Sequence, residues 1–303
     1  MKAVVVGYGS IGERHTRVLG EIGCTTAVVS RREVDVPLRY GSVEDAIASF
    51  DPGYVVIASA TTEHDTDLRR VRATGFRGPV LVEKPLFDSY RELNGIDTDN
   101  VFVVYNLRFH PVMQRLYELL RGEKILTFHA YVGQYLPTWR PGRDYRTVYS
   151  AHADKGGGVL RDLSHEMDYV QWMCGRWRRL TAAGGHLSSL EITSDDVFSL
   201  LVETERVPVV TIQINYLDRI SQRTIVVNTD EHTFKADLIA GTLQVDDRTE
   251  QFSVVRDQAF RDQHIAVLEN RRECICSFDE GNEIMRMIET AEQANTSRIW
   301  ISR

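Results

Sequence analysis

A glycine-rich turn near the N-terminus constrains the fold more than any other feature of this sequence. Residues 3–6 form an apolar run, AVVV, and the pattern G-x-G-x-x-G follows directly over Gly7–Gly12. In such a turn the first glycine allows a tight reversal, and the second admits a phosphate close to the backbone. The third lets strand and helix pack closely. The turn therefore predicts a dinucleotide-binding βαβ unit; the alternative is a purely structural glycine turn.

The first hundred residues alternate between apolar strands and amphipathic helices. Strands are expected over 3–7, 26–30, 53–60, 78–85 and 101–106, and helices over 10–23, 42–50 and 63–75. Near-continuous apolar strands that alternate with helices indicate a parallel sheet covered on both faces. The pattern predicts an α/β protein whose N-terminal domain, residues 1–107, is a doubly wound Rossmann domain.

The pattern changes after residue 107. One helix is expected over 111–122 and another over 280–297, and the segments between them show the twofold alternation of antiparallel strands. These segments are 124–135, 197–217, 223–238 and 241–247. Residues 108–303 are therefore predicted to form a second α/β domain with a large, mostly antiparallel sheet.

Composition excludes several classes of protein. The net charge of −7 provides no basic surface for nucleic acid, and no apolar stretch approaches the ~20 residues that span a bilayer. The four cysteines are too scattered for a zinc ribbon or a disulfide framework. The chain begins directly with a strand and shows no signal-peptide pattern, so a cytoplasmic protein is expected.

The residues after the second predicted strand bear on the choice of cofactor. An acidic residue there would bind the adenosine ribose hydroxyls, but this chain has Ser30, Arg31 and Arg32. A hydroxyl and two guanidiniums can hold a 2′-phosphate through charge-assisted hydrogen bonds. The sequence thus predicts NADP, with NAD possible; the alternative is that the arginines are surface charges.

Two further motifs accompany the glycine turn. The tripeptide E-K-P covers Glu83–Pro85 at the end of a predicted strand, and Y-N-x-R covers Tyr105–Arg108. With these motifs the chain resembles the Gfo/Idh/MocA family of NAD(P)-dependent oxidoreductases of sugars, inositols and sugar derivatives. The resemblance covers essentially the full length, and the wider stretch over 133–175 resembles a subgroup associated with bacterial surface-sugar biosynthesis.

The resemblance implies roles for individual residues. Lys84 would lie beside the nicotinamide and the substrate hydroxyl, while Asn106 and Arg108 would complete the cofactor and substrate pockets. Together with the glycine turn and the residues after the second strand, the predicted cofactor-binding set is Gly7, Tyr8, Gly9, Ser10, Ile11, Gly12, Ser30, Arg31, Arg32, Ser59, Ala60, Thr61, His64, Glu83, Lys84 and Asn106. The family's second sheet commonly carries the dimer contact, so a homodimer or homotetramer through the C-terminal sheet is expected.

Three glycines at 156–158 precede Asp162, His165 and Asp168. We expect the glycines to bring the chain close to the nicotinamide and to begin a helix that carries His165, the general acid/base, with Asp162 one turn away. At about 3.6 residues per turn this spacing keeps Asp162 and His165 on one helix face. The family more often spaces the pair by four. The alternative is a surface helix with an incidental histidine.

Asp168 lies about 120° around the helix from Asp162, so no metal site is predicted.

The loop over 139–146 combines aromatic and basic side chains. Trp139, Arg140, Arg143 and Tyr145 are candidates to stack on a sugar ring and to pair with an anionic group of the substrate. The alternative is a surface loop held by salt bridges.

The motifs together predict hydride transfer between the nicotinamide and a sugar, a sugar nucleotide or a related polyol or keto-sugar. Lys84 would stabilise the reacting oxygen and His165 would exchange its proton. Two alternatives remain. One is an enzyme that uses transient oxidation by a retained cofactor for glycoside cleavage or epimerisation. The other is a non-catalytic regulator that senses the dinucleotide.

Overall fold

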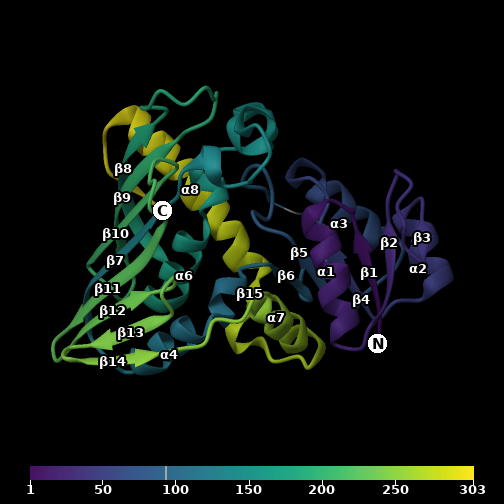
Figure 1. The fold of residues 1–303 in the computed structure, drawn as a ribbon, viewed down its shortest axis with the longest axis horizontal. Coiled ribbons are helices and arrows are strands. Elements are labelled where there is room, and N and C mark those ends of the chain that lie inside the picture. The colour runs from purple at the N-terminus through teal and green to yellow at the C-terminus, as the bar shows by residue number, and fades with distance from the viewer. Residues whose placement is uncertain (93) are drawn as a thin grey trace. The chain divides into compact units, whose positions relative to one another are not determined.

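The computed structural model describes residues 1–92 and 94–303 and divides into two compact units (Figure 1). The first unit contains Met1–Phe109 and Val255–Met285, and the second contains His110–Val254 and Arg286–Arg303. The sequence places a single boundary after residue 107 and assigns everything beyond it to the second domain. In the structure, residues 255–285 instead return to the first unit.

The described residues of the first unit form a seven-stranded sheet. Its strands are β1 (Lys2–Val6), β2 (Thr25–Val29), β3 (Arg39–Tyr40), β4 (Tyr54–Ile57), β5 (Val80–Val82), β6 (Val101–Val103) and β15 (Cys276–Ser277). Their order is β15-β6-β5-β4-β1-β2-β3, and neighbouring strands are parallel except for β15 with β6. This is the predicted doubly wound parallel sheet.

The strand register brings the predicted motifs to one edge of this sheet. Val6 at the end of β1 pairs with Val29 and with Ile57, and Ile57 pairs with Val82. The glycine turn and the segments that follow β2, β4 and β5 therefore all leave the sheet at its carboxyl edge. In open parallel sheets this edge is where ligands bind.

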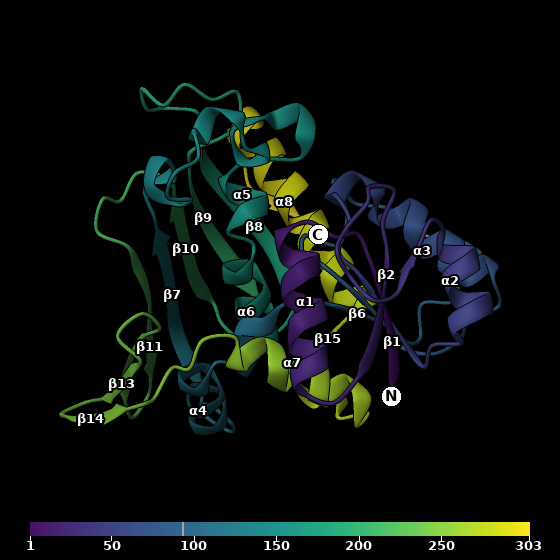
Figure 2. The same ribbon diagram turned by 45° about the vertical axis from the view of Figure 1, so that its right-hand side comes forward.

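Helices cover both faces of the first sheet (Figure 2). On one face lie α1 (Ser10–Glu21) and α7 (Gln258–Leu268), and on the other lie α2 (Val43–Phe50) and α3 (His64–Ala73). Short 3₁₀ helices cover Thr61–Glu63, Asn106–Phe109 and Arg272–Cys274. The buried cluster on the α1/α7 side contains Ala3, Val5, Leu19, Tyr54, Val56, Ala58, Leu81, Phe102, Val104, Ala266, Val267 and Ile275. The sequence did not predict α7, which closes this core.

The described residues of the second unit form a nine-stranded sheet. Its strands are β7 (Ile125–Gly133), β8 (Trp177–Gly185), β9 (Val197–Thr204), β10 (Val209–Asn215), β11 (Gln222–Thr229), β12 (Thr233–Asp237), β13 (Thr242–Val245), β14 (Arg248–Gln251) and β16 (Ile301–Ser302). The order is β14-β13-β12-β11-β7-β10-β9-β8-β16, and only β7 with β10 is parallel among these pairs. The predicted large, mostly antiparallel sheet is confirmed.

Helices cover one face of the second sheet. The helices that contribute to this unit are α4 (Pro111–Leu119), α5 (Val159–Asp162), α6 (His165–Cys174) and the later part of α8 (Phe278–Ser297). Figure 1 shows α6 and α8 on the same side of the strands. Along β7, Phe128, Ala130 and Val132 alternate as buried positions, which is the pattern of a sheet with one face against the core.

The loops of the second unit contain short 3₁₀ helices over Leu136–Thr138, Tyr145–Thr147, Tyr149–Ala151 and Ala153–Lys155. No helix among the described residues is both long and apolar enough to cross a membrane.

The glycine-led segment differs from its predicted form. Asp162 ends α5 and His165 begins α6, so the two residues do not share one helix. Between them Leu163 has φ −103° and ψ 32°, outside the helical region. The single-helix geometry predicted for Asp162 and His165 is therefore wrong, because the backbone turns at Leu163 and a new helix starts.

Candidate functional site

The glycine turn has the local geometry that the motif predicts. Gly7 has φ 93°, and a β-carbon there would lie 2.6 Å from the backbone nitrogen of Ser59. A β-carbon at Gly12 would meet the carbonyl oxygen of Gly7 at 2.1 Å, whereas one at Gly9 would meet nothing within 4 Å. The first and third glycines are thus required by packing. The second opens onto free space beside the start of α1, where no side chain caps the helix.

A cavity of about 890 Å³ lies against this turn in the first unit. Of the predicted cofactor-binding residues its lining contains Gly7, Tyr8, Gly9, Ser10, Ile11, Ser30, Arg31, Arg32, Ser59 and Ala60. The lining also includes Arg70 and the carboxylates of Glu44, Glu63 and Asp67. The remaining members of the predicted set, Gly12, Thr61, His64, Glu83, Lys84 and Asn106, do not line it.

The segment after β2 is held by its own turn. The Ser30 hydroxyl donates to the Arg32 carbonyl at 2.9 Å and accepts the Arg32 N–H at 3.2 Å. Arg31 pairs with Glu63 at 3.3 Å, and its side chain is 76% exposed. Arg39 on β3 donates to the Ser30 carbonyl at 3.3 Å and was not predicted. Its pairing with Val28 in the neighbouring strand places it here.

His64 links two segments at the carboxyl edge of the sheet. Its Nε2 lies 3.2 Å from the Ser59 carbonyl oxygen, and its Nδ1 lies 3.1 Å from that of Leu86. Burial lowers the pKa of His64, so the ring is neutral near pH 7. A neutral ring has one N–H and donates to only one of these carbonyls, so the histidine packs between the loop after β4 and the turn after β5, in which the Lys84–Pro85 peptide bond is cis.

The Glu83 carboxylate points into the core beneath Lys84. One oxygen accepts the Lys84 backbone N–H at 3.0 Å, and the other lies 2.8 Å from Nε2 of His15 on α1. His15 Nδ1 lies 2.8 Å from His264 Nε2, and His264 Nδ1 lies 2.9 Å from the Tyr54 hydroxyl. Sequence reasoning missed His15, Tyr54 and His264, because no local motif relates positions that meet only in the fold.

Arg108 is also engaged within the first unit. It is 1% exposed and donates to Glu280 at 3.1 Å. Burial raises the pKa of Glu280, but Arg108 and the Ser277 N–H outweigh this effect, so the pKa lies below its usual value. Asn106 and Arg108 share one short 3₁₀ helix that follows β6.

In the second unit, Asp162 is 4% exposed and accepts a hydrogen bond from the Tyr216 hydroxyl at 2.7 Å. Burial and the neighbouring Asp162 carboxylate raise the pKa of Tyr216 well above its usual value. The ring of Trp139 packs edge-on against Tyr216, with centroids 5.3 Å apart. The structure therefore brings together two predicted residues, Asp162 and Trp139, through Tyr216, which sequence reasoning missed.

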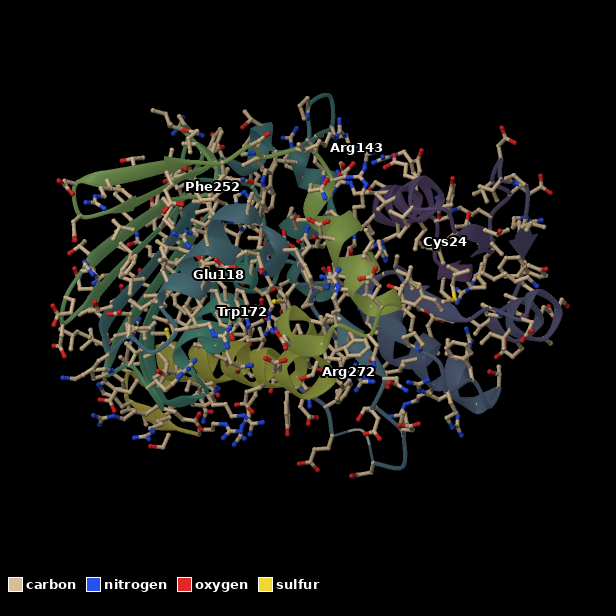
Figure 3. The ribbon with its side chains drawn as sticks, turned by 90° about the horizontal axis from the view of Figure 1, so that it is seen from below. Cys24, Glu118, Arg143, Trp172, Phe252 and Arg272 are labelled. Atoms are coloured by element: carbon tan, nitrogen blue, oxygen red, sulfur yellow. The ribbon has the colours of Figure 1, made fainter. Side chains whose placement is uncertain are left out.

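The other predicted substrate-binding residues of this loop are Arg140, Arg143 and Tyr145, and each has different surroundings. The Arg140 guanidinium lies over the Tyr149 ring, 5.2 Å from its centroid. The Tyr145 hydroxyl accepts the Glu191 N–H at 3.2 Å, and Arg143 is exposed (Figure 3). Trp139 thus reaches Asp162 through Tyr216. Arg140 reaches it through Tyr149, whose pKa is raised by burial and by the Asp162 carboxylate.

His165 is the one partly accessible residue of α6. The nine residues that follow it in the helix are all buried, whereas His165 itself is half-buried. The first position of the helix therefore presents an imidazole at the margin of the unit's core, which suits a proton-exchanging group.

Two of the three glycines, Gly157 and Gly158, have a packing role inside the second unit. A β-carbon at Gly157 would lie 2.1 Å from the Tyr149 carbonyl oxygen, and one at Gly158 would lie 2.2 Å from the Asp195 carboxylate. Asp195 accepts the Leu160 N–H at the start of α5, and burial raises its pKa to about 6. The glycines thus let the chain pass close to these groups before α5 begins.

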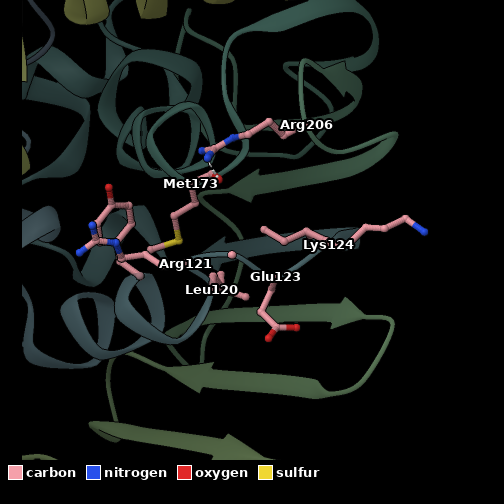
Figure 4. A pocket seen from close by; sticks show the side chains of 9 residues that line it. Leu120, Arg121, Glu123, Lys124, Met173 and Arg206 are labelled. Carbon is pink, nitrogen blue, oxygen red and sulfur yellow. Dashed lines mark hydrogen bonds between the residues drawn. The ribbon is translucent and has the colours of Figure 1, made fainter.

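A second cavity, of about 410 Å³, lies in the second unit around the turn between α4 and β7 (Figure 4). Its lining includes Arg121, Lys124 and Arg206, but none of the predicted site residues. Arg206 donates to the Met173 carbonyl at 2.6 Å, which satisfies a carbonyl at the end of α6.

The predicted site residues are divided between the units. Lys84 and the glycine turn belong to the first, whereas Asp162 and His165 belong to the second. Their joint action on one substrate remains a prediction. Among the residues that the structure describes, no group of three His, Cys, Asp or Glu side chains is arranged to hold a metal ion.

The sheet order and the glycine turn make the first unit a Rossmann fold, and the second unit is an α/β domain built on one large sheet. Residues 113–235 match the family model described as GFO/IDH/MocA C-terminal domain. This match lies in the second unit and confirms the resemblance to that family. No curated protein matches the chain.

Solved structures show the same fold over the whole chain. GenD2 from gentamicin A biosynthesis, in complex with NAD, has a TM-score of 0.82 at 22% identity, covering 100% of this chain and 96% of its own. Levoglucosan dehydrogenase, in complex with NADH and levoglucosan, has a TM-score of 0.85 at 14% sequence identity, and the match covers 100% of this chain and 99% of that protein. The WlbA dehydrogenase from Bordetella pertussis, in complex with NADH and UDP-GlcNAcA, has a TM-score of 0.82 at 16% sequence identity, and the match covers 100% of this chain and 97% of that protein.

Proposed function

We propose that this protein is an NAD(P)-dependent oxidoreductase that transfers hydride between the nicotinamide and a sugar, a sugar nucleotide or a related polyol or keto-sugar. The observation that carries the proposal is the glycine turn opening onto the 890 Å³ cavity at the carboxyl edge of a Rossmann sheet. The match to the GFO/IDH/MocA C-terminal domain supports it. So does the likeness to solved structures that hold NAD or NADH, two of them of dehydrogenases.

The described residues fit a dinucleotide. Gly9 leaves room for a pyrophosphate beside the uncapped start of α1, where backbone N–H groups and the helix dipole favour negative charge. Ser59 and Ala60 line the same cavity from the loop after β4. When bound, a nicotinamide would donate or accept the hydride, and the residues below would manage charge and protons.

We further propose a preference for NADP. Arg31 and Arg32 line the cavity beside the end of β2, where a 2′-phosphate would lie. The Ser30 hydroxyl is engaged with the Arg32 backbone, so the two guanidiniums carry the preference. Arg31 would exchange its exposed pairing with Glu63 for the phosphate, because exposed ion pairs contribute little free energy.

We assign the proton and charge steps to three residues. Lys84 would hold the substrate oxygen by its ammonium as negative charge develops, and His165 would give or take the oxygen's proton. Asp162, fixed by the Tyr216 hydroxyl, would accept a substrate hydroxyl or orient the imidazole. Trp139 and Arg140 would offer an aromatic face and a cation, which suits a sugar that carries an anionic group.

Two substitutions test this proposal directly. Lys84→Ala and His165→Ala should each lower the rate of NADPH oxidation with a sugar panel by at least about a hundredfold, while dinucleotide affinity stays within a few fold. Lys124→Ala and His232→Ala are matched controls, because both side chains are exposed and pair with the surface carboxylates of Asp230 and Asp246. Full activity in both site variants would refute the catalytic assignment.

The same assay separates the alternatives. Glycoside cleavage or epimerisation by transient oxidation would require oxidised cofactor yet cause no net change in cofactor absorbance. A dinucleotide-sensing regulator would bind cofactor and turn over no sugar. Loss of activity with binding retained in the Lys84 and His165 variants would support the oxidoreductase.

A further inference from the structure

A chain of four polar side chains crosses the core of the first unit beneath Lys84. It runs from Tyr54 to His264, from His264 to His15, and from His15 to Glu83, with separations of 2.9, 2.8 and 2.8 Å. Tyr54, His15 and His264 are 0% exposed, and Glu83 is 8% exposed. Such a chain within an apolar cluster calls for an explanation, since each buried polar group costs free energy unless it is satisfied.

The proposed chemistry uses none of these four side chains directly. His15 comes from α1, Tyr54 from the start of β4, and His264 from α7, all on the same face of the sheet. Glu83 follows Leu81 by two residues and so faces the same side. The chain therefore extends along the sheet from its amino edge, at Tyr54, to its carboxyl edge, at Glu83.

Hydrogen-bond directions follow from the chemistry of the partners. Burial lowers the pKa of His264 well below its usual value, with a smaller effect of His15, and burial raises that of Tyr54. A buried neutral phenol is best satisfied when it donates, so Tyr54 O–H donates to His264 Nδ1. His264 Nε2–H then donates to His15 Nδ1, and His15 Nε2–H donates to Glu83.

This order leaves the Glu83 carboxylate held on both sides. One oxygen accepts from His15 and the other accepts the backbone N–H of Lys84. We propose that His15, held by His264 and Tyr54, is a positioning residue that fixes Glu83 and, through Glu83, the backbone that carries Lys84. The expected effect of His15 on the rate of hydride transfer rests on the proposed oxidoreductase function. The effect of His15 on the position of the Lys84 backbone does not.

Residues 255–285, which return to the first unit, supply one member of this series of side chains. Helix α7 supplies His264, which lies 249 residues after His15 in the sequence and hydrogen-bonds to it. It also supplies Phe260, whose ring packs edge-on against His15 with centroids 5.4 Å apart. The His15 ring is therefore oriented by one aromatic contact and two hydrogen bonds.

Substitutions at His15 and Tyr54 test the chain. His15→Leu removes both hydrogen bonds at similar size, whereas His15→Gln keeps an amide N–H near the position of Nε2. Tyr54→Phe removes only the far hydroxyl and is the mildest change. Leu19→Ala is the matched control, because it disturbs the same core from the same helix without a polar group.

The first readout is hydrogen exchange at the Lys84 backbone N–H in the full chain, measured by NMR. His15→Leu should accelerate this exchange by about tenfold relative to neighbouring strand amides, Tyr54→Phe should accelerate it less, and His15→Gln should restore most of the protection. Leu19→Ala should leave the exchange at Lys84 unchanged relative to those amides.

The second readout is hydride-transfer kinetics. His15→Leu should lower kcat by about tenfold with little change in KM for the dinucleotide, and His15→Gln should recover most of kcat. Unchanged exchange at Lys84 in folded His15→Leu would overturn the proposal. If that variant does not fold, exchange at Lys84 in Tyr54→Phe equal to that of the wild type would overturn the proposal.

Failure of the proposed function gives a different result. If the wild type transfers no hydride with any sugar tested, the oxidoreductase assignment fails. The exchange measurement at Lys84 still decides whether His15 positions this backbone.

Discussion

Gly12 lies so close to Gly7 that a β-carbon on Gly12 would come within 2.1 Å of the Gly7 carbonyl oxygen. Gly9, between them in sequence, would meet nothing within 4 Å. One turn thus contains a glycine that the fold requires and a glycine whose space is left for a ligand. The two positions can be separated by experiment.

The glycine pair gives the first prediction. Gly12→Ala should lower the free energy of unfolding by about 1–3 kcal/mol through overpacking, and it should abolish dinucleotide binding. Gly9→Ala should keep the thermal midpoint of the wild type but weaken NADPH binding by tenfold or more. Thermal unfolding and isothermal titration measure the two effects. Gly20→Ala on α1 is the control, because its added methyl meets nothing within 4 Å. Normal NADPH affinity in Gly9→Ala would contradict this account of the turn.

Cofactor preference gives the second prediction. Arg31→Ala and Arg32→Ala should each raise the dissociation constant for NADPH by about tenfold, the value of one charge-assisted hydrogen bond, and should hardly change that for NADH. Fluorescence titration of both dinucleotides measures this. Arg77→Ala, exposed and outside the cavity lining, should change neither. A clear preference of the wild type for NAD would refute the NADP assignment.

The hydroxyl that holds Asp162 gives the third prediction. Tyr216→Phe removes a buried hydrogen bond of 2.7 Å to a carboxylate, so unfolding should become easier by about 1–3 kcal/mol. If Asp162 acts on the substrate, kcat should also fall while dinucleotide affinity stays constant. Tyr131→Phe, which removes a hydroxyl bonded to Asp218, is the control and should leave kcat unchanged. Equal kcat in wild type and Tyr216→Phe would argue against a role for Asp162.

Asp195 gives a prediction about pH. Burial raises its pKa to about 6, so the folded state holds a proton that the unfolded chain has already lost near pH 4. The folded state therefore binds more protons, and the contribution of Asp195 to stability falls as the pH rises from about 4 to 6. Asp195→Asn, which can still accept the Leu160 N–H, should be more stable than wild type at pH 8 by up to about 3 kcal/mol.

Urea unfolding of both proteins at pH 4 and pH 8 measures this difference. The gap in unfolding free energy should fall to well below about 1 kcal/mol at pH 4, because Asp195 is then protonated in the folded state and about half protonated in the unfolded chain. A gap of the same size at both pH values would show that the effect of the substitution does not arise from titration of Asp195.

The sequence predicts those features that depend on local pattern. The strands of the first sheet, the glycine turn and the alternating strands of the second sheet all follow from hydrophobic periods and turn residues within short windows. These parts agree with the structure. The predicted roles of Gly7, in a tight reversal, and of Gly12, in close packing of strand and helix, also agree with the structure. Both roles depend on backbone contacts within one strand–turn–helix unit.

Other features depend on contacts between distant segments, which no short window contains. His15 and His264 lie 249 residues apart, and Asp162 and Tyr216 lie 54 apart. The break at Leu163 falls in a stretch whose helical spacing continues across it, so periodicity alone does not locate it. Residues 255–285 return to the first unit because α7 and β15 complete its core and its sheet edge.

The central claim is a net transfer of hydride between the nicotinamide and a sugar carbon. Incubating the protein with NADPH carrying deuterium at both C4 positions, together with a panel of keto-sugars and nucleotide-linked keto-sugars, tests it most directly. Mass spectrometry should find deuterium on one sugar carbon, with one oxidised cofactor formed per labelled product. Sugar that is cleaved or epimerised without net cofactor oxidation, or cofactor that binds and keeps all its label throughout the panel, would contradict the claim.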